Sequence, residues 1–171
     1  LDAKDAYTAG HSQRVSEMAL KVCELIGLKK KDILKIHIAA HLHDIGKIGI
    51  PDAILNKEGR LTDEEFEIMK THSAIGAGIL SKSKSLSEFS DIVLHHHERF
   101  DGKGYPDGLK GEKIPVGARI IAICDSIDAM TSNRRYRKAL GFDVCYQEIE
   151  KNLGKMYDPI IGQYVLDHFD K

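Results

Sequence analysis

The chain has 171 residues, of which 42% are apolar and 30% are charged, and its formal net charge at pH 7 is -1. This length fits one domain with a sizeable core and leaves little room for two. The near-neutral charge excludes the broad basic field of a protein that binds a nucleic acid polymer. No apolar run reaches the ~20 residues that cross a bilayer, so we expect no membrane segment in this chain.

Three scattered cysteines form no C-x-x-C pair. This pattern favours buried free thiols over a zinc ribbon or a redox pair. Free thiols persist in a reducing compartment, so we expect a cytoplasmic protein.

Apolar residues recur at spacings of three and four along the first part of the chain, which predicts helices. One stripe covers residues 15–26 and stops at Gly27, and a second covers residues 32–44 and stops at Gly46. Glycine after the last periodic residue is a common helix stop signal.

The middle of the chain continues this pattern. Thr62 and Glu65 have the spacing of a capping box and predict a helix start, and residues 75–80 and 86–94 carry further helical stripes. Together these stripes predict an all-α fold, a single helical bundle.

Residues 98–115 differ from the rest because glycine and proline interrupt them, which predicts a long loop over residues 98–113. The apolar run 120–127 that follows is interpreted as a buried helix, with a short strand over residues 119–123 as the alternative. Asp158 before Pro159 has the pattern of a helix cap and predicts the last helix.

Nine histidines are unusual for this length. His43 and Asp44 stand together at the end of the second predicted helix. Imidazole and carboxylate are both good ligands for divalent iron, manganese and zinc. A histidine at a helix end with a surface aspartate is the plainer alternative, and the dipeptide alone does not exclude it.

The candidate ligands taken together favour a metal site more strongly than the pair His43-Asp44 alone. Asp125 lies inside an apolar run, where a carboxylate is costly to bury without a cation or strong hydrogen bonds. Metal sites in helical bundles are assembled from side chains of several facing helices. Five separated segments each offer such a ligand, namely His11, His43 with Asp44, His72, His96 with His97, and Asp125.

These residues belong to longer motifs that resemble a known family. The segment His43-Asp44-Ile45-Gly46-Lys47 resembles the signature of HD-domain phosphohydrolases. Its continuation in His96-His97-Glu98-Arg99, Asp101-Gly102 and Gly104-Tyr105-Pro106 is similar to that of the HD-GYP subfamily. The same holds for Asp125, for Asp128-Ala129-Met130-Thr131-Ser132, and for Arg134, Tyr136 and Arg137. The match runs from Tyr7 to Pro159, and agreement over so many ordered segments is highly specific.

The resemblance implies a role for each matching residue. It implies catalytic roles for Lys47 and Asp44, the latter as a bridging carboxylate, and substrate contacts for Tyr105, Arg134 and Arg137. The metal ligands that it implies are His11, His43, Asp44, His72, His96, His97 and Asp125.

The resemblance further implies a phosphodiesterase that hydrolyses cyclic di-GMP to pGpG and onward to GMP, with iron or manganese as cofactor. Metal coordination lowers the pKa of water from 15.7 to roughly 7, so we expect a hydroxide that bridges two metals to attack phosphorus. The alternatives are a phosphohydrolase for another cyclic dinucleotide or nucleotide, and a cyclic di-GMP sensor without turnover.

Two positions depart from the family pattern. Three-metal members carry a glutamate four residues before the first ligand histidine, where this chain has Tyr7. We therefore expect two divalent metal ions. Arg135 replaces a proline that is frequent in the family, which removes a fixed backbone angle and adds a positive charge.

Four histidines match no family ligand. His37 and His41 share one helix face at a spacing of four, which by itself suits a metal pair, but we expect both to be peripheral. We also expect His95 to lie outside the site and His168 to lie on the surface.

Family members commonly follow a sensory or receiver domain. A start at Leu1 favours a catalytic domain, residues 1–171, excised from a longer protein. The resemblance also implies a diguanylate cyclase (GGDEF) domain as a partner.

Overall fold

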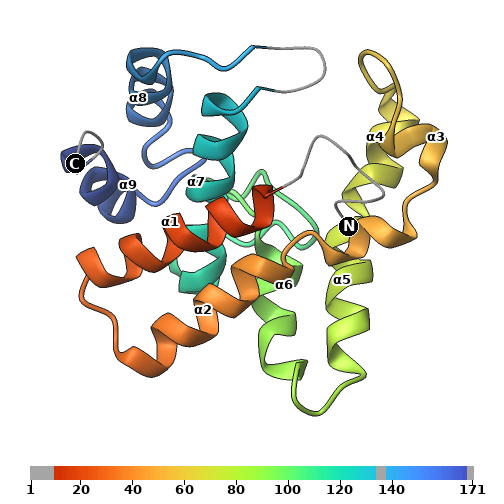
Figure 1. Cartoon of the computed structure of the whole chain (residues 1–171), viewed down its shortest axis with the longest axis horizontal. Coiled ribbons are helices and arrows are strands. Elements are labelled where there is room, and N and C mark those ends of the chain that lie inside the picture. Colours follow the sequence, from red (N-terminus) through yellow and green to blue (C-terminus); the bar gives the residue numbers. More distant parts are fainter. Residues whose placement is uncertain (1–9, 134–137, 169–171) are drawn as a thin grey trace.

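The computed structural model of the chain describes residues 10–133 and 138–168, and within these ranges it contains helices and no β-strand (Figure 1). The predicted all-α fold is confirmed. The helices are α1 (His11–Leu25), α2 (Lys30–Leu42), α3 (Asp52–Leu55), α4 (Asp63–Lys70), α5 (His72–Ser81), α6 (Ser90–His95), α7 (Val116–Thr131), α8 (Phe142–Lys151) and α9 (Pro159–Asp167), with short 3-10 turns η1 (Ile45–Gly49), η2 (Ser87–Phe89) and η3 (Gly111–Lys113).

Helix α1 packs against α2 and α7, and these three helices form the centre of the core. The predicted stripe of α1 is buried, with Val15, Ala19 and Cys23 fully inaccessible to solvent. Gly27 has a φ of 74° and follows the last turn of α1. Only glycine adopts this left-handed conformation readily, which is why the helix stops there.

Helix α7 settles the alternative for the apolar run 120–127, because all of it is helical and the short strand is wrong. Ile120, Ile121 and Ile123 are fully buried. A helix that is apolar on nearly every face belongs in the core, and α7 contacts α1, α6, α8 and α9. Asp125 lies on this helix and is mostly shielded, with 22% of its side chain exposed.

Turn η1 lies against the start of α5 with almost no space between the two backbones. A Cβ atom at Gly46 would lie 1.8 Å from the carbonyl oxygen of His72 and 2.5 Å from the amide nitrogen of Gly76. Gly46 is therefore required for this contact. It does not end α2 as the sequence predicted, because α2 stops at Leu42 and Gly46 lies within η1. The contact holds the chain segment after His43 and Asp44 directly beside His72.

Two helix starts follow the predicted capping chemistry. Thr62 and Glu65 form a reciprocal capping box at α4. Asp158 caps α9 by accepting hydrogen bonds from the backbone N–H groups of Ile160 and Ile161, and it also accepts one from the Arg119 guanidinium of α7.

Helices α3 and α8 were not predicted. Helix α3 has four residues, too few to show a period. Helix α8 buries only Cys145 and Ile149, while Phe142 and Val144 at its start are exposed. Phe142, Cys145, Tyr146 and Ile149 nevertheless recur at positions i, i+3, i+4 and i+7, so the sequence carried a helical stripe for α8 that the prediction passed over.

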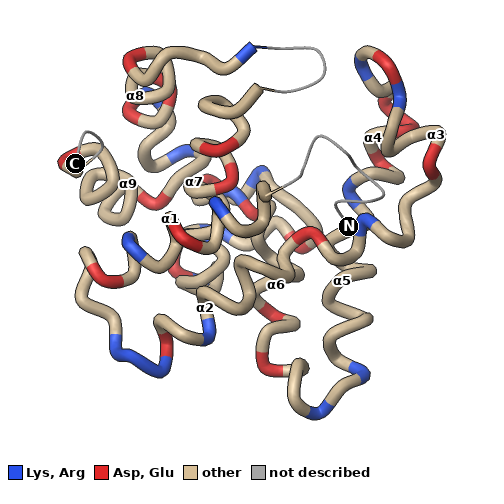
Figure 2. Tube along the Cα trace, in the orientation of Figure 1, with Lys and Arg blue, Asp and Glu red and all other residues tan. Residues whose placement is uncertain are grey.

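Figure 2 shows acidic and basic residues interspersed along the chain trace, in keeping with the net charge of -1. Among the described residues, no helix combines the length and the apolar character needed to span a bilayer.

Asp158→Ala should lower the free energy of unfolding by about 2–4 kcal/mol, because it removes a helix cap and leaves a half-buried arginine without its carboxylate. Thr62→Ala, which removes a cap at an exposed helix start, should cost about 1 kcal/mol. Urea unfolding monitored by circular dichroism measures both. Equal losses in the two variants would contradict the role assigned to Asp158.

Candidate functional site

The predicted ligands come from five helix ends or interiors and meet at one place. His11 is the first residue of α1, His72 is the first residue of α5, and Asp125 lies within α7. The pair His43-Asp44 lies between α2 and η1, and the pair His96-His97 directly follows α6. These side chains form three sets, and within each set the ligand atoms lie within 4.8 Å of one another. The sets are His72 with His96 and His97, His11 with His43 and Asp125, and His43 with Asp44 and His96.

Three of the imidazoles are oriented by the same kind of hydrogen bond. The Nδ1 atom of His43 donates to the carbonyl of Ala40 at 2.6 Å. Likewise, His72 donates to Met69 at 2.7 Å and His96 donates to Val93 at 2.6 Å. Because a carbonyl can only accept, each Nδ1 carries the proton, and each Nε2 presents a lone pair.

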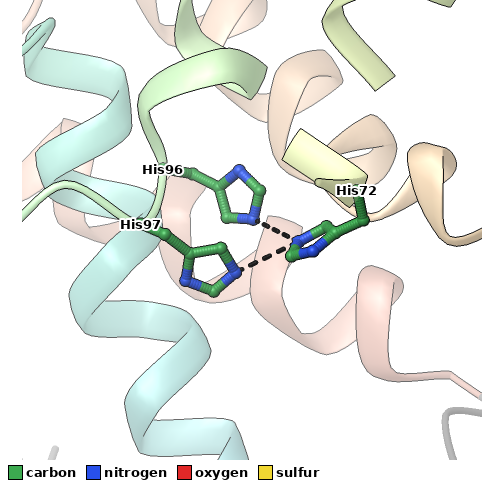
Figure 3. Close-up of side chains that lie close together, drawn as sticks. All are labelled: His72, His96 and His97. Carbon is green, nitrogen blue, oxygen red and sulfur yellow. Dashed lines mark hydrogen bonds between the residues drawn. The ribbon is translucent and has the colours of Figure 1, made fainter. Parts of the chain in front are cut away.

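The Nε2 atoms point toward one another. The Nε2 atom of His72 lies 3.4 Å from that of His96 and 3.2 Å from that of His97, as Figure 3 shows. In the His72–His96 pair both Nε2 atoms present lone pairs, which repel each other at this distance unless a cation lies between them. The buried Nε2 atom of His43 has no hydrogen-bond partner among the described residues. A buried polar atom without a partner is costly, and in native proteins it often marks the place of a bound ion.

Two carboxylates complete the cluster. Asp44 is 6% exposed, and its two oxygens lie 3.5 Å from the Nε2 atom of His72 and 3.7 Å from that of His11. Lys47 donates to Asp44 at 2.7 Å. An oxygen of Asp125 lies 3.2 Å from the Nε2 atom of His11. Asp44 thus lies between the His11 side and the His72 side of the cluster.

Burial keeps most of the imidazoles neutral. It lowers the pKa of His72, holds the pKa of His96 well below its usual range, and brings the pKa of His97 from 6.5 to about 4. Neutral imidazole is the form that binds metals. These three side chains are therefore ready to act as ligands at neutral pH.

His11 behaves in the opposite way. Burial alone would lower its pKa, but hydrogen bonds to Asp125 and Asp128 outweigh burial and raise the pKa from 6.5 to about 9. Burial would raise the pKa of Asp125, yet the hydrogen bond from His11 holds it below its usual range. The carboxylates on this side of the cluster thus attract positive charge strongly.

The donor set fits divalent transition metals. It combines neutral imidazole nitrogens with ionised carboxylate oxygens, a mixture that suits iron, manganese and zinc. The hydrogen bonds from the Nδ1 atoms to backbone carbonyls are of the kind that metal-binding histidines usually make with the ring nitrogen that faces away from the metal. The buried Nε2 atom of His43 makes no hydrogen bond and lies 3.5 Å from an oxygen of Asp44, and this is the single observation that most directly calls for an ion.

Tyr105 lies at the edge of the cluster and stacks on His97, with ring centroids 4.9 Å apart and an interplanar angle of 26°. The side chain of Lys47 is 21% exposed, so it contacts Asp44 of the cluster and is also accessible from solvent. The other expected substrate contacts, Arg134 and Arg137, lie outside the described residues, as do Tyr7 and Arg135.

The glycine before Tyr105 is required by a backbone contact. A Cβ atom at Gly104 would lie 2.3 Å from the amide nitrogen of Arg99 and 2.6 Å from the carbonyl oxygen of His97. The loop is folded back so closely onto the segment after α6 that only glycine fits. This contact places Tyr105 on the ring of His97.

Sequence reasoning assigned no role to three residues that support the cluster. Asp128 accepts hydrogen bonds from His11 at 2.7 Å and from Arg14 at 2.6 Å, and thereby fixes the His11 ring. Its spacing of three from Asp125 on one helix was the available signal. Glu98 is 3% exposed and accepts a hydrogen bond from the backbone N–H of Asp107, which ties the long loop to α6.

The remaining histidines make other contacts. His41 and His37 bond to the side chain and the backbone of Ser16, respectively. His95 bonds to Asp107 at 2.9 Å, and His168 is exposed. Among the described residues, none of the four belongs to a set of ligand atoms that could hold a metal ion.

The HD domain family model matches residues 1–161. The chain belongs to the HD domain family. The recognition made from the sequence is thus confirmed, and the family is metal-dependent.

Several relatives are similar over nearly all of this chain. A "Cyclic di-GMP phosphodiesterase" of Thermotoga maritima is 48% identical over 95% of this chain and 45% of its own length. The "Cyclic di-GMP phosphodiesterase response regulator RpfG" of Xanthomonas campestris is 42% identical over 93% and 43%, respectively. A "3'3'-cGAMP-specific phosphodiesterase 2" of Vibrio cholerae is 35% identical over 100% and 33%. The chain thus spans less than half the length of these relatives.

Solved structures show the same fold at low identity. A cyclic GMP-AMP specific phosphodiesterase of V. cholerae (V-cGAP3) superposes with a TM-score of 0.73 at 16% identity, over 94% of this chain and 44% of that one. The HD domain of the L. monocytogenes phosphodiesterase PgpH superposes with a TM-score of 0.68 at 21% identity, over 99% and 94%.

Protein purified anaerobically with iron or manganese should carry two metal ions per chain, because neutral imidazoles and buried carboxylates converge there. Removal of the metal with EDTA should lower Tm by several degrees, since a ligand that binds only the folded state stabilises it. His43→Ala should bind less metal, and His37→Ala should bind as much as the wild type. Elemental analysis measures the metal content of all three proteins, and full metal content in His43→Ala would contradict the site.

Gly104→Ala should displace the loop from the backbone of His97 and Arg99, and we expect a loss of about 1–3 kcal/mol in the free energy of unfolding. Gly59→Ala is the matched control, because a Cβ atom there meets no atom within 4 Å, although its φ of 99° carries some strain. Chemical denaturation compares the two. A loss at Gly104 no larger than at Gly59 would show that the close contact is unimportant.

Proposed function

We propose that this chain is a metal-dependent phosphodiesterase that hydrolyses cyclic di-GMP to pGpG and onward to GMP. The observation that carries the proposal is the convergence of five imidazoles and two carboxylates, with the buried Nε2 atom of His43 making no hydrogen bond. Relatives named for cyclic di-GMP hydrolysis at 42–48% identity support the substrate.

Two of the three sets of ligand atoms share no residue, and Asp44 belongs to the third set, which takes one histidine from each of them. We propose that His11, His43 and Asp125 hold one divalent ion and that His72, His96 and His97 hold the other, with Asp44 between them. Iron and manganese are the proposed metals. Divalent cations held there polarise phosphoryl oxygens and make water acidic enough to supply a nucleophile at neutral pH.

The chain's own residues bind and orient the substrate. Lys47 is proposed to donate to a phosphate oxygen, while its bond to Asp44 fixes its position. Tyr105 presents a ring on which a base can stack, as aromatic side chains do for nucleotides in general. Arg134 and Arg137 are proposed as planar donors to phosphate or guanine.

A second cyclic dinucleotide is a specific alternative. Relatives of V. cholerae named 3'3'-cGAMP-specific phosphodiesterases are 35–38% identical to this chain. A sensor without turnover is less well supported, because every expected ligand is present in the cluster.

The relatives that match this chain are more than twice its length. We propose that residues 1–171 form a cytoplasmic catalytic domain of a longer protein with an N-terminal sensory or receiver domain. The greater length of the relatives supports this arrangement. A diguanylate cyclase (GGDEF) domain is the proposed partner.

Asp44→Ala should reduce kcat for cyclic di-GMP at least about 1,000-fold, because it removes the carboxylate shared by both ligand groups. His37→Ala, which alters a histidine outside the cluster, should retain wild-type turnover. Chromatography of products from cyclic di-GMP, cyclic GMP–AMP and nucleoside monophosphates measures activity and specificity.

Circular dichroism checks that both variants remain helical. Near-normal turnover in Asp44→Ala would contradict the assigned site. Tight binding of cyclic di-GMP by the metal-loaded wild type without any product would favour the sensor instead.

A further inference from the structure

Lys70 is a cation next to the cluster for which the proposed mechanism has no role. It is the last residue of α4 and precedes His72 by two positions. Its Nζ atom lies 5.6 Å from the ring centroid of Tyr105 and 5.6 Å from that of Phe66. Tyr105 also stacks on His97, so one aromatic ring contacts both the ammonium group of Lys70 and the cluster.

The contacts of Lys70 are weak enough to be exchanged for a ligand. Its ion pair with Glu67 has an N–O distance of 2.6 Å, but the Glu67 side chain is 69% exposed. Exposed pairs of this kind contribute about 0–1 kcal/mol, and exposed cation–π contacts contribute about 0.5–1 kcal/mol. A phosphate group that approached Lys70 could replace Glu67 at small cost.

A cyclic dinucleotide carries negative charge that a cation at this position can neutralise. Its small ring carries two phosphodiester groups, each with one negative charge, and only one of them is cleaved at a time. The other remains close to the cluster, where Asp44 and Asp125 are ionised. A net charge of -1 offers no general positive field, so local cations have to neutralise both phosphates, and Lys70 adds one to the proposed contacts of Lys47, Arg134 and Arg137.

We infer that Lys70 binds the phosphate of the cyclic dinucleotide that is not being cleaved, between the aromatic faces of Tyr105 and Phe66. Phe66 is 48% exposed, so its ring is available for a base. Stacking of bases on aromatic side chains contributes about 1–3 kcal/mol per base. This inference rests on the proposed function and makes Lys70 a residue that selects two-phosphate substrates.

The test compares cyclic di-GMP with bis(p-nitrophenyl) phosphate, a diester with one phosphate and no base. In Lys70→Met, the ratio of kcat/KM for cyclic di-GMP to kcat/KM for the small diester should fall about tenfold, which corresponds to about 1.4 kcal/mol. The fall should come mainly from a higher KM for cyclic di-GMP, because the phosphate is bound equally in the ground state and the transition state. Lys70→Arg should recover most of the ratio.

Lys57→Met is the matched control, because Lys57 is likewise paired at 2.6 Å with a glutamate of α4, Glu65. It should leave the ratio unchanged. An unchanged ratio in Lys70→Met, or an equal loss with both substrates, would overturn the inference while leaving the proposed function intact. A wild-type protein that cleaves the small diester and no cyclic dinucleotide would overturn the proposed function itself.

Discussion

Each of three buried imidazoles is held through Nδ1 by a backbone carbonyl three residues earlier in the chain. That one hydrogen bond fixes the tautomer, turns the ring and directs the Nε2 lone pair into the interior. The bond forms where α2 meets η1, where α4 meets α5 and at the end of α6. At these places the helix does not continue, so the carbonyls lack the partner that a continuing helix would supply. The same feature that ends a helix therefore directs an imidazole lone pair into the interior.

The packing of the surrounding helices has to offset the unfavourable energy of this cluster. Lone pairs that face one another and buried carboxylates destabilise a protein that lacks a cation. The helices are nevertheless held together by close contacts, of which Gly46 against the backbone of α5 is the tightest. Asp128 and Arg14 fix the His11 ring from outside the cluster in a similar way. The surrounding helices thus hold together a cluster of side chains that is unfavourable in the absence of a cation.

Much of this architecture could be predicted from the sequence. The buried stripe of α1, the capping box at Thr62 and the cap at Asp158 each depend on neighbouring residues, so local patterns reveal them. The seven expected ligands converge as the family resemblance implied. Spacing alone could not have shown this, because His11 and Asp125 are separated by most of the chain and meet only through packing.

The features that escaped prediction depend on tertiary contacts. The support that Asp128 gives to His11 joins two helices that are distant in sequence. The need for glycine at position 104 arises where the loop folds back onto the residues after α6, which no local pattern reveals. The position of Lys70 above Tyr105 likewise depends on how α4 lies against that loop.

Anomalous diffraction from crystals of the iron-loaded or manganese-loaded protein, recorded at the absorption edge of the metal, tests the central claim most directly. The account predicts two peaks, one bonded to the Nε2 atoms of His72, His96 and His97 and one bonded to His11, His43 and Asp125, with Asp44 touching both. Peaks at His37 and His41 instead, or no peak within the cluster, would contradict it.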